Sequence, residues 1–203
     1  MNVKNTEVYW LNESMIASGY PMLREPIEDI KKEISENLNV AERRSNILAN
    51  EKRTGHANFL KGIITQFDLD FTVKAWYEAQ RYKFLDFVSS MSTMHRLTQM
   101  NMDEVFNEYV DEDLKNKMKN LIAEYNENPS KENKLRVLYN CPMWLRFTAR
   151  MTTNYMQLRQ IYHQRRNHEL PDWQEFCDWI ETLPHSEWIT GNAIPFEDNK
   201  RNN

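Results

Sequence analysis

The segment TTNYMQLRQIYHQRRNH, residues 152–168, holds the polar side chains best suited to binding chemistry. If this segment is helical, one continuous face carries residues spaced at i, i+4, i+7 and i+11, which are Asn154, Leu158, Ile161 and Arg165. Burying an amide and a guanidinium without partners costs several kcal/mol. We therefore expect Asn154 and Arg165 to border a polar pocket or a subunit interface, which is compatible with a bound anion but does not require one.

Arginine is concentrated between residues 136 and 166, a stretch without any acidic residue; its members are Arg136, Arg146, Arg150, Arg159, Arg165 and Arg166. The whole chain has a net charge of -4 and a pI near 5.8, which disfavours binding of a long nucleic acid through a broadly basic surface. A local concentration of arginine suits a small anionic ligand. The alternative is that these arginines pair with Asp and Glu side chains elsewhere in the fold, and the sequence leaves both interpretations open.

Other reactive residue types lack the spacing that their chemistry needs. No H-E-x-x-H pattern is present, so we expect no metal site. The serines at positions 89, 90 and 92 lack the flanking glycines of a nucleophile elbow. Without a glycine-rich phosphate loop, a flavin would have to be held by arginines and helix ends. The two cysteines, Cys141 and Cys177, are expected to be buried free thiols.

The elements that position these residues follow from hydrophobic periodicity. Residues 63–73 alternate apolar and polar positions and give the clearest predicted strand, and residues 1–25 predict a strand and a loop. Helices are predicted over residues 26–38, 40–53, 74–92, 103–127 with a break near 111–113, 131–140, 143–167 and 172–182. Asp172 is the expected cap of the last helix. The pattern predicts a mixed α/β chain with helix in excess.

Length and composition suggest one domain over residues 1–193, followed by a polar tail over residues 194–203. No apolar run approaches the ~18–20 residues that a membrane span needs. The beginning of the sequence, MNVKNTEVYWLNE, lacks the basic flank and apolar stretch of a secretory signal. We therefore expect a cytoplasmic protein that does not enter a membrane.

The arginine-rich region also resembles the flavin-dependent thymidylate synthases (the ThyX family). That family has a late helix of pattern T-x-N-x-R-x-L-x-x-F-x-x-L-R, preceded by A-R-x-x-L-P, and this chain has TTNYMQLRQIYHQRR, preceded by LRVLYNCP and followed by PDWQEF. Arg136 matches the arginine of the first block if two extra residues precede Pro142, and Asn154 and Arg165 match positions in the second. Met156 departs from the pattern, because the family has arginine there.

The resemblance continues upstream. Gly55–His56 matches a G-H pair before the strand, Arg81–Tyr82–Lys83 matches an R-H-R block, and Glu78 matches a glutamine three residues earlier. The block SSMSTMHRL keeps a serine at Ser92 and a basic pair at His95–Arg96, but it lacks the family's N-E and S-x-R motifs. The blocks TGHANFLKGI, SSMSTMHRL and RRNHELPDWQEFCDWIETLP also resemble phage and Firmicutes proteins related to this family. Apart from the resemblance, His56 is most simply a turn residue after Gly55, and His95–Arg96 is equally well explained as an exposed basic pair.

The resemblance implies an α+β, helix-rich, ThyX-like fold, with a short antiparallel sheet packed by long helices. It implies FAD as cofactor, bound by His56, Glu78, Arg81, Lys83 and Asn154. It implies a nucleotide like deoxyuridylate (dUMP) as substrate, bound by Arg136, Arg165, Ser92 and Arg96, with Arg165 also withdrawing charge from the pyrimidine as the catalytic residue. It further implies a homo-oligomer, a tetramer or a dimer, whose sites are shared between subunits.

Two functions of different classes follow. The first is an enzyme that carries out a flavin-dependent methylation, or related chemistry, at C5 of a uridine-type nucleotide, with reduced flavin as the source of hydride. The second is a catalytically degenerate relative that sequesters or senses a nucleotide, or that binds a host protein as a phage accessory protein. The missing N-E and S-x-R motifs and Met156 favour the second.

Overall fold

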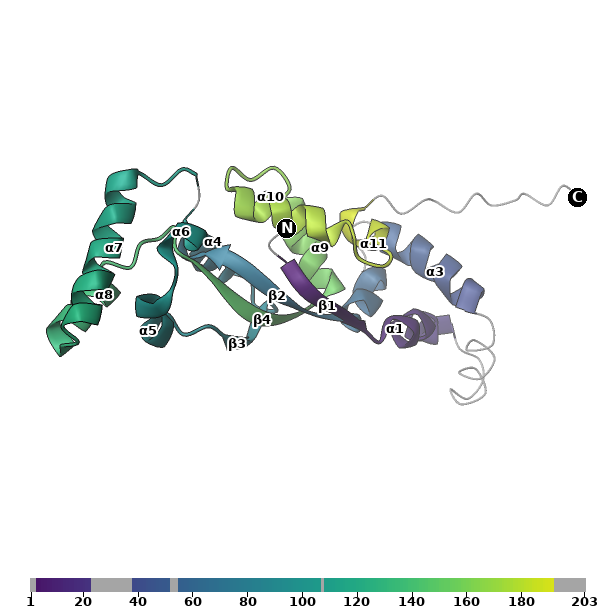
Figure 1. Ribbon diagram of the computed structural model, residues 1–203. Helices are drawn as coiled ribbons and strands as arrows, with labels where there is room; N and C mark the ends of the chain where they lie inside the picture. The colour runs from purple at the N-terminus through teal and green to yellow at the C-terminus, as the bar shows by residue number, and fades with distance from the viewer. Residues whose placement is uncertain (1–2, 23–37, 52–54, 107, 192–203) are drawn as a thin grey trace, which may run out of the picture.

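The computed structural model describes residues 3–22, 38–51, 55–106 and 108–191 (Figure 1). The helix expected over residues 26–38 falls almost entirely outside these ranges, and so does the polar tail expected over residues 194–203. The helix expected over residues 40–53 is present as α3 (Leu38–Asn50).

A four-stranded antiparallel sheet forms the centre of the fold, with strand order β1-β2-β4-β3. Its strands are β1 (Val3–Tyr9), β2 (Ile64–Thr72), β3 (Asp86–Ser90) and β4 (Arg146–Asn154). The strand predicted over residues 63–73 is therefore confirmed. Its alternation has the expected physical cause, because Phe67, Leu69 and Phe71 are buried on one face while Asp68 and Asp70 lie on the other.

The apolar face of the sheet packs against α9 (Tyr155–Arg165) and α10 (Pro171–Ile180), as Figure 1 shows. Aromatic side chains make much of this contact: the ring centroids of Phe67 and Trp179 are 4.3 Å apart, and those of Phe71 and Trp173 are 5.0 Å apart. α11 (Glu187–Thr190) and α3 extend the same core, together with α1 (Leu11–Ala17) and the 3-10 helix η2 (Gly55–Lys61).

A second, smaller hydrophobic cluster lies at the other end of the molecule, on the left in Figure 1. Its members come mainly from η3 (Leu97–Gln99), α6 (Met102–Val105), α7 (Glu112–Glu127) and α8 (Lys131–Tyr139), and the short helix α5 (Thr93–Arg96) precedes η3. The helix predicted over residues 103–127 is broken as expected, but the break begins earlier than residues 111–113, because α6 ends at Val105 and α7 begins at Glu112. Asp111 caps α7 by accepting a hydrogen bond from the backbone N–H of Asp113, 2.9 Å long. The helix predicted over residues 131–140 is confirmed as α8.

Two helix predictions are wrong. Residues 146–154 of the helix predicted over 143–167 form the central strand β4, and the helix begins only at Tyr155. In β4 the buried residues Ala149, Met151 and Thr153 recur every second position, which is a strand period. The helix predicted over residues 74–92 ends after α4 (Val73–Ala79), and residues 86–90 pair with β4 as the edge strand β3.

The prediction that Asp172 caps the last helix is also wrong. The N-cap of α10 is Leu170, and no side chain caps that position. The Asp172 carboxylate instead accepts hydrogen bonds from the backbone N–H and the hydroxyl of Thr72, 3.1 and 3.3 Å long, so it joins α10 to the end of β2. None of the described helices is long and apolar enough to span a bilayer.

Candidate functional site

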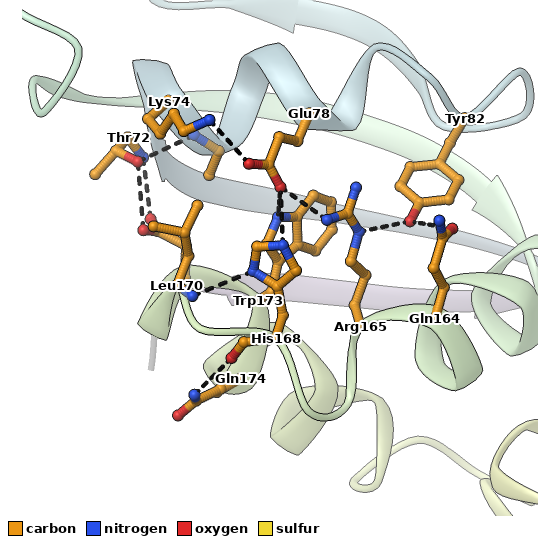
Figure 2. A network of polar contacts seen from close by, with 12 residues as sticks. Thr72, Lys74, Glu78, Tyr82, Gln164, Arg165, His168, Leu170, Trp173 and Gln174 are labelled. Carbon is orange, nitrogen blue, oxygen red and sulfur yellow. Dashed lines mark hydrogen bonds and ion pairs between the residues drawn. The ribbon is translucent and has the colours of Figure 1, made fainter.

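The most extensive buried polar network surrounds Arg165, at the end of α9 (Figure 2). The Arg165 side chain is only 5% exposed. Its Nη1 donates to Oε2 of Glu78 on α4 at 2.8 Å, so two residues expected to bind ligands form a buried ion pair with each other. A buried guanidinium requires such a partner, because an unpaired charge in the interior is strongly destabilising.

Two aromatic rings enclose the remaining surface of the Arg165 guanidinium. Its Nε donates to the hydroxyl of Tyr82 at 2.8 Å, and this hydroxyl donates to Oε1 of Gln164 at 2.8 Å. The Arg165 Cζ atom lies 4.7 Å from the ring centroid of Trp173 and 5.7 Å from that of Tyr82, which are cation–π distances. Burial raises the pKa of Tyr82 and the hydrogen bond from Arg165 opposes that shift, so the phenol stays protonated.

Glu78 is the centre of this network, because four groups contact its carboxylate. Besides Arg165, they are Lys74 Nζ at 3.1 Å, Trp173 Nε1 at 3.1 Å and His168 Nε2 at 3.3 Å. Burial acts to raise the pKa of Glu78, but the hydrogen bonds from Lys74 and Trp173 and the charges of His168 and Arg165 outweigh it, so the net pKa is lowered. Glu78 is therefore an anion that stabilises the cations around it.

His168 is oriented by the turn that precedes α10. Its Nδ1 accepts a hydrogen bond from the backbone N–H of Leu170 at 3.2 Å, which assigns the ring proton of the neutral imidazole to Nε2, facing Glu78 (Figure 2). No motif or spacing in the sequence predicts this role of His168. The i, i+4 spacing of Lys74 and Glu78 is the one contact of the network that could have been found from sequence.

Asn154 and Arg165 lie at opposite ends of α9. Asn154 is the N-cap residue, and its side-chain oxygen accepts from the backbone N–H of Gln157 at 2.9 Å. Eleven residues of α-helix separate the two positions by about 16 Å. Each side chain thus contacts polar groups of its own surroundings, and Asn154 has a capping role that accounts for its amide without a ligand.

Arg136, the other expected nucleotide ligand, lies on α8 in the smaller hydrophobic cluster and pairs with Glu124 of α7 at 2.6 Å. The remaining members of the arginine-rich stretch also have partners. Arg146 pairs with Asp70 and Asp172, Arg150 with Asp68, and Arg166 with Asp178 and Glu181, while Arg159 donates to the backbone oxygen of Ala49. Five of the six arginines therefore pair with a carboxylate, as the interpretation of pairing within the fold expects, and the sixth, Arg159, contacts a backbone oxygen.

The other expected ligand residues surround the edge strand β3, where Arg81 and Lys83 precede the strand and Ser92 and Arg96 follow it. All four are exposed. The guanidinium groups of Arg81 and Arg96 differ from those of the other arginines in the described ranges, because neither forms a hydrogen bond or an ion pair there. His56 on η2 is also exposed, and its Nε2 lies 3.7 Å from Glu51. In the part of the chain that the structure describes, no three His, Cys, Asp or Glu side chains are grouped to hold a metal ion.

Comparison with known proteins gives a result for structure but not for sequence. No protein-family model matches the chain, and no curated protein sequence matches it. Two crystal structures of the flavin-dependent thymidylate synthase ThyX from Helicobacter pylori, both with FAD and dUMP, are similar to it at 16% sequence identity. The first has a TM-score of 0.67 and covers 98% of each chain. The second has a TM-score of 0.66 and covers 98% of this chain and 99% of the other.

The chain has the ThyX fold. Agreement over nearly the full length of both chains confirms the expected α+β, helix-rich architecture. An identity of 16% means that most side chains differ between the two proteins. The binding properties of this chain must therefore be argued from its own side chains.

Proposed function

We propose that this chain is a diverged member of the ThyX superfamily, related to phage and Firmicutes proteins, that binds FAD and acts on a uridine-type nucleotide by methyl transfer and reduction at C5. The observation that carries the proposal is the match to ThyX over 98% of the chain, with structures that hold FAD and dUMP. We place this activity in the cytoplasm.

The residues around β3 fit the phosphates of FAD in charge and in accessibility. Arg81 and Lys83 lie at one end of β3 and Arg96 at the other, and five residues of strand span about 17 Å. Exposed guanidinium groups without internal partners are free to bind phosphate oxygens in pairs. Asn154 and His56 would contact the rest of the cofactor. When bound, reduced flavin supplies the hydride, and the protein supplies position and charge.

The uridine-type nucleotide would be held by Arg165, Arg136, Ser92 and Arg96. Arg165 is closed off by Glu78 and Tyr82 in this structure, so it can bind an anion only if Glu78 moves away or if the guanidinium is shared between Glu78 and the ligand. Residues from a second copy of the chain would complete the site in a dimer or tetramer. Large apolar side chains exposed around β3 support such an assembly, among them Phe84, Val88 and Met94, which are 61%, 55% and 59% exposed.

The alternative is a catalytically degenerate ThyX-like protein that binds, sequesters or senses a nucleotide, or that binds a host protein. One structural observation favours it: the arginine expected to act on the pyrimidine is buried in an ion pair. Met156 and the missing N-E and S-x-R motifs agree with it. In this alternative Arg81 and Arg96 still bind the phosphates of the nucleotide, and no flavin is required.

The absorbance spectrum of the purified chain separates the two. The enzyme hypothesis expects a yellow protein, tight binding of FAD, and calorimetric binding of dUMP. The alternative expects a colourless protein that binds dUMP alone. Both expect the double variant Arg81→Ala/Arg96→Ala to lose nucleotide affinity, while the control Lys117→Ala, an exposed cation on α7, keeps it. A colourless protein that binds neither FAD nor dUMP refutes the enzyme hypothesis and the nucleotide-binding form of the alternative, and leaves only binding of a host protein.

A further inference from the structure

A cavity of about 550 Å³ adjoins the Arg165 network at Lys74, which lines the cavity and also pairs with Glu78. It forms where the first turn of α4 meets the turn before α10 and the segment before β4. Its volume falls within the usual range for small-molecule sites, and no residue proposed above as a ligand of FAD or dUMP lines it.

The floor of the cavity is built from buried polar groups that are already satisfied. Asp172 accepts from the backbone N–H and the hydroxyl of Thr72, and Arg146 Nη1 lies 3.4 Å from the same carboxylate. Thr72 also caps α4 by accepting from the backbone N–H of Ala75 at 3.2 Å. Because these groups have partners within the fold, the floor is fixed before any ligand enters.

The walls of the cavity are apolar, and backbone hydrogen bonds join the segment that carries them to the start of α4. Backbone oxygens of Met143 and Leu145 accept from the N–H groups that begin α4, at 2.8 and 2.9 Å. This contact places the indole of Trp144 beside the cavity, where it packs edge-to-face on Phe106 at a centroid distance of 4.3 Å. Leu170 and Tyr109 also line the cavity. A ligand with a flat apolar body would gain the most from such walls.

The charges at the rim decide which ligand fits. Lys74 is the one cation among the lining residues, and Glu78 neutralises it at 3.1 Å, as Figure 2 shows. The charge of Asp172 is offset by Arg146. Glu169 is exposed and has no ion-pair partner within the described ranges, so it is the uncompensated charge of the rim. Glu169 would repel an anionic ligand. It would attract a cationic ligand, and the indole ring of Trp144 would attract the same cation.

We propose that this cavity is a second ligand site, separate from the proposed nucleotide site, that takes a small aromatic molecule carrying a protonated amine. The ring lies against Trp144 and Leu170, and the ammonium group pairs with Glu169. The lining residues come from the end of β2, the start of α4, Tyr109, residues 143 and 144, the turn before α10 and its first residues, so the site does not require flavin or a second subunit.

Three ligands with the same ring and different charges test the proposal: tryptamine, indole and indole-3-propionate. They are titrated into the isotope-labelled full chain while the indole N–H signals of its 6 tryptophans are followed by NMR, with Trp144→Phe used to assign the relevant signal. We expect millimolar affinity for tryptamine, about threefold weaker binding of indole, and the weakest binding for indole-3-propionate. The Trp144 signal should move most.

Variants at the exposed Glu169 test the charge without disturbing the core. Glu169→Gln should make tryptamine and indole bind equally, and Glu169→Lys should reverse the preference toward indole-3-propionate. The matched control Glu13→Gln, an exposed carboxylate on α1, should leave all three affinities unchanged. Equal binding of the three ligands to the native chain, unchanged selectivity in Glu169→Gln, or no binding up to about 10 mM would overturn the proposal. Because none of these titrations contains flavin or dUMP, the result is independent of the proposed function.

Discussion

Replacing Glu78 by glutamine should destabilise the protein more than removing its partner Arg165. Glu78→Gln leaves a guanidinium that is 5% exposed without a counter-charge in the described structure, which costs roughly 3 kcal/mol. Arg165→Met leaves the Glu78 carboxylate with Lys74, His168 and Trp173, so we expect a loss of about 2 kcal/mol. The loss of unfolding free energy in the double variant should be about 2 kcal/mol smaller than the sum of the losses in the two single variants.

Thermal and urea unfolding measure these differences. For a chain of this length, 1 kcal/mol corresponds to about 2–4 °C, so Glu78→Gln should lower Tm by about 6–12 °C. Lys74→Gln is the matched control, because it removes an exposed ion pair from the same carboxylate and should cost less than about 1 kcal/mol. Equal losses for Lys74→Gln and Glu78→Gln, or additive losses in the double variant, would show that burial of Arg165 does not govern the energy of this network.

The pH dependence of unfolding offers a second measurement on the same residue. The pKa of Glu78 is lowered below its ordinary value of 4.5 in the folded state, so its contribution to stability is present above that pH. The contribution is lost as the pH falls through the folded-state pKa, because the unfolded chain then binds the proton more readily. The acid loss of stability should therefore be smaller in Glu78→Gln than in the native chain.

Three further outcomes follow from individual side chains. Thr65→Val should raise the free energy of unfolding by about 1 kcal/mol in urea titrations, because the buried hydroxyl of Thr65 has no hydrogen-bond partner among the residues that the structure describes; a loss of stability would contradict this. Asn154→Ala should cost about 1 kcal/mol through loss of the α9 cap, while Asn154→Asp, which keeps the acceptor, should cost little in the same assay. Burial raises the pKa of Cys177 to about 12, so this thiol should react with a thiol reagent at pH 8 only when the chain unfolds, whereas rapid reaction in native buffer would show that it is accessible.

Secondary structure could be predicted from sequence where a single hydrophobic period, that of a strand or that of a helix, dominates a segment. β2 alternates cleanly because one of its faces is buried and the other is polar, so the strand predicted over residues 63–73 is confirmed. β4 was missed because the helical spacing of the segment that follows continues back across the strand, and its inner positions are the small or flexible Ala149 and Met151. β3 was missed because all five residues are exposed, and only pairing with β4 makes them a strand.

The candidate site shows a different limit, since it depends on contacts between distant segments. Glu78 and Arg165 both match positions of family motifs. Such a match does not indicate that the two residues, 87 positions apart in the chain, pair with each other. The roles of His168 and Trp173 likewise follow from the turn before α10, which places both against α4. Local spacing cannot predict such a network, because its members become buried and contact one another only when the helices pack together.

The arginine concentration illustrates why charge counted along a sequence differs from charge in space. Strand β2 and helices α4, α7 and α10 bring carboxylates to Arg136, Arg146, Arg150, Arg165 and Arg166, so the most basic stretch of sequence is largely neutralised in the fold. Arg81 and Arg96 come from less basic stretches, and their side chains have no ion-pair partner in the described part of the chain, where they lie exposed beside the edge strand. An incoming phosphate does not have to displace a carboxylate to reach them, whereas at Arg165 it has to compete with Glu78 at 2.8 Å. Accessibility and the absence of a competing anion therefore make β3, and not the end of α9, the place where a nucleotide would first bind.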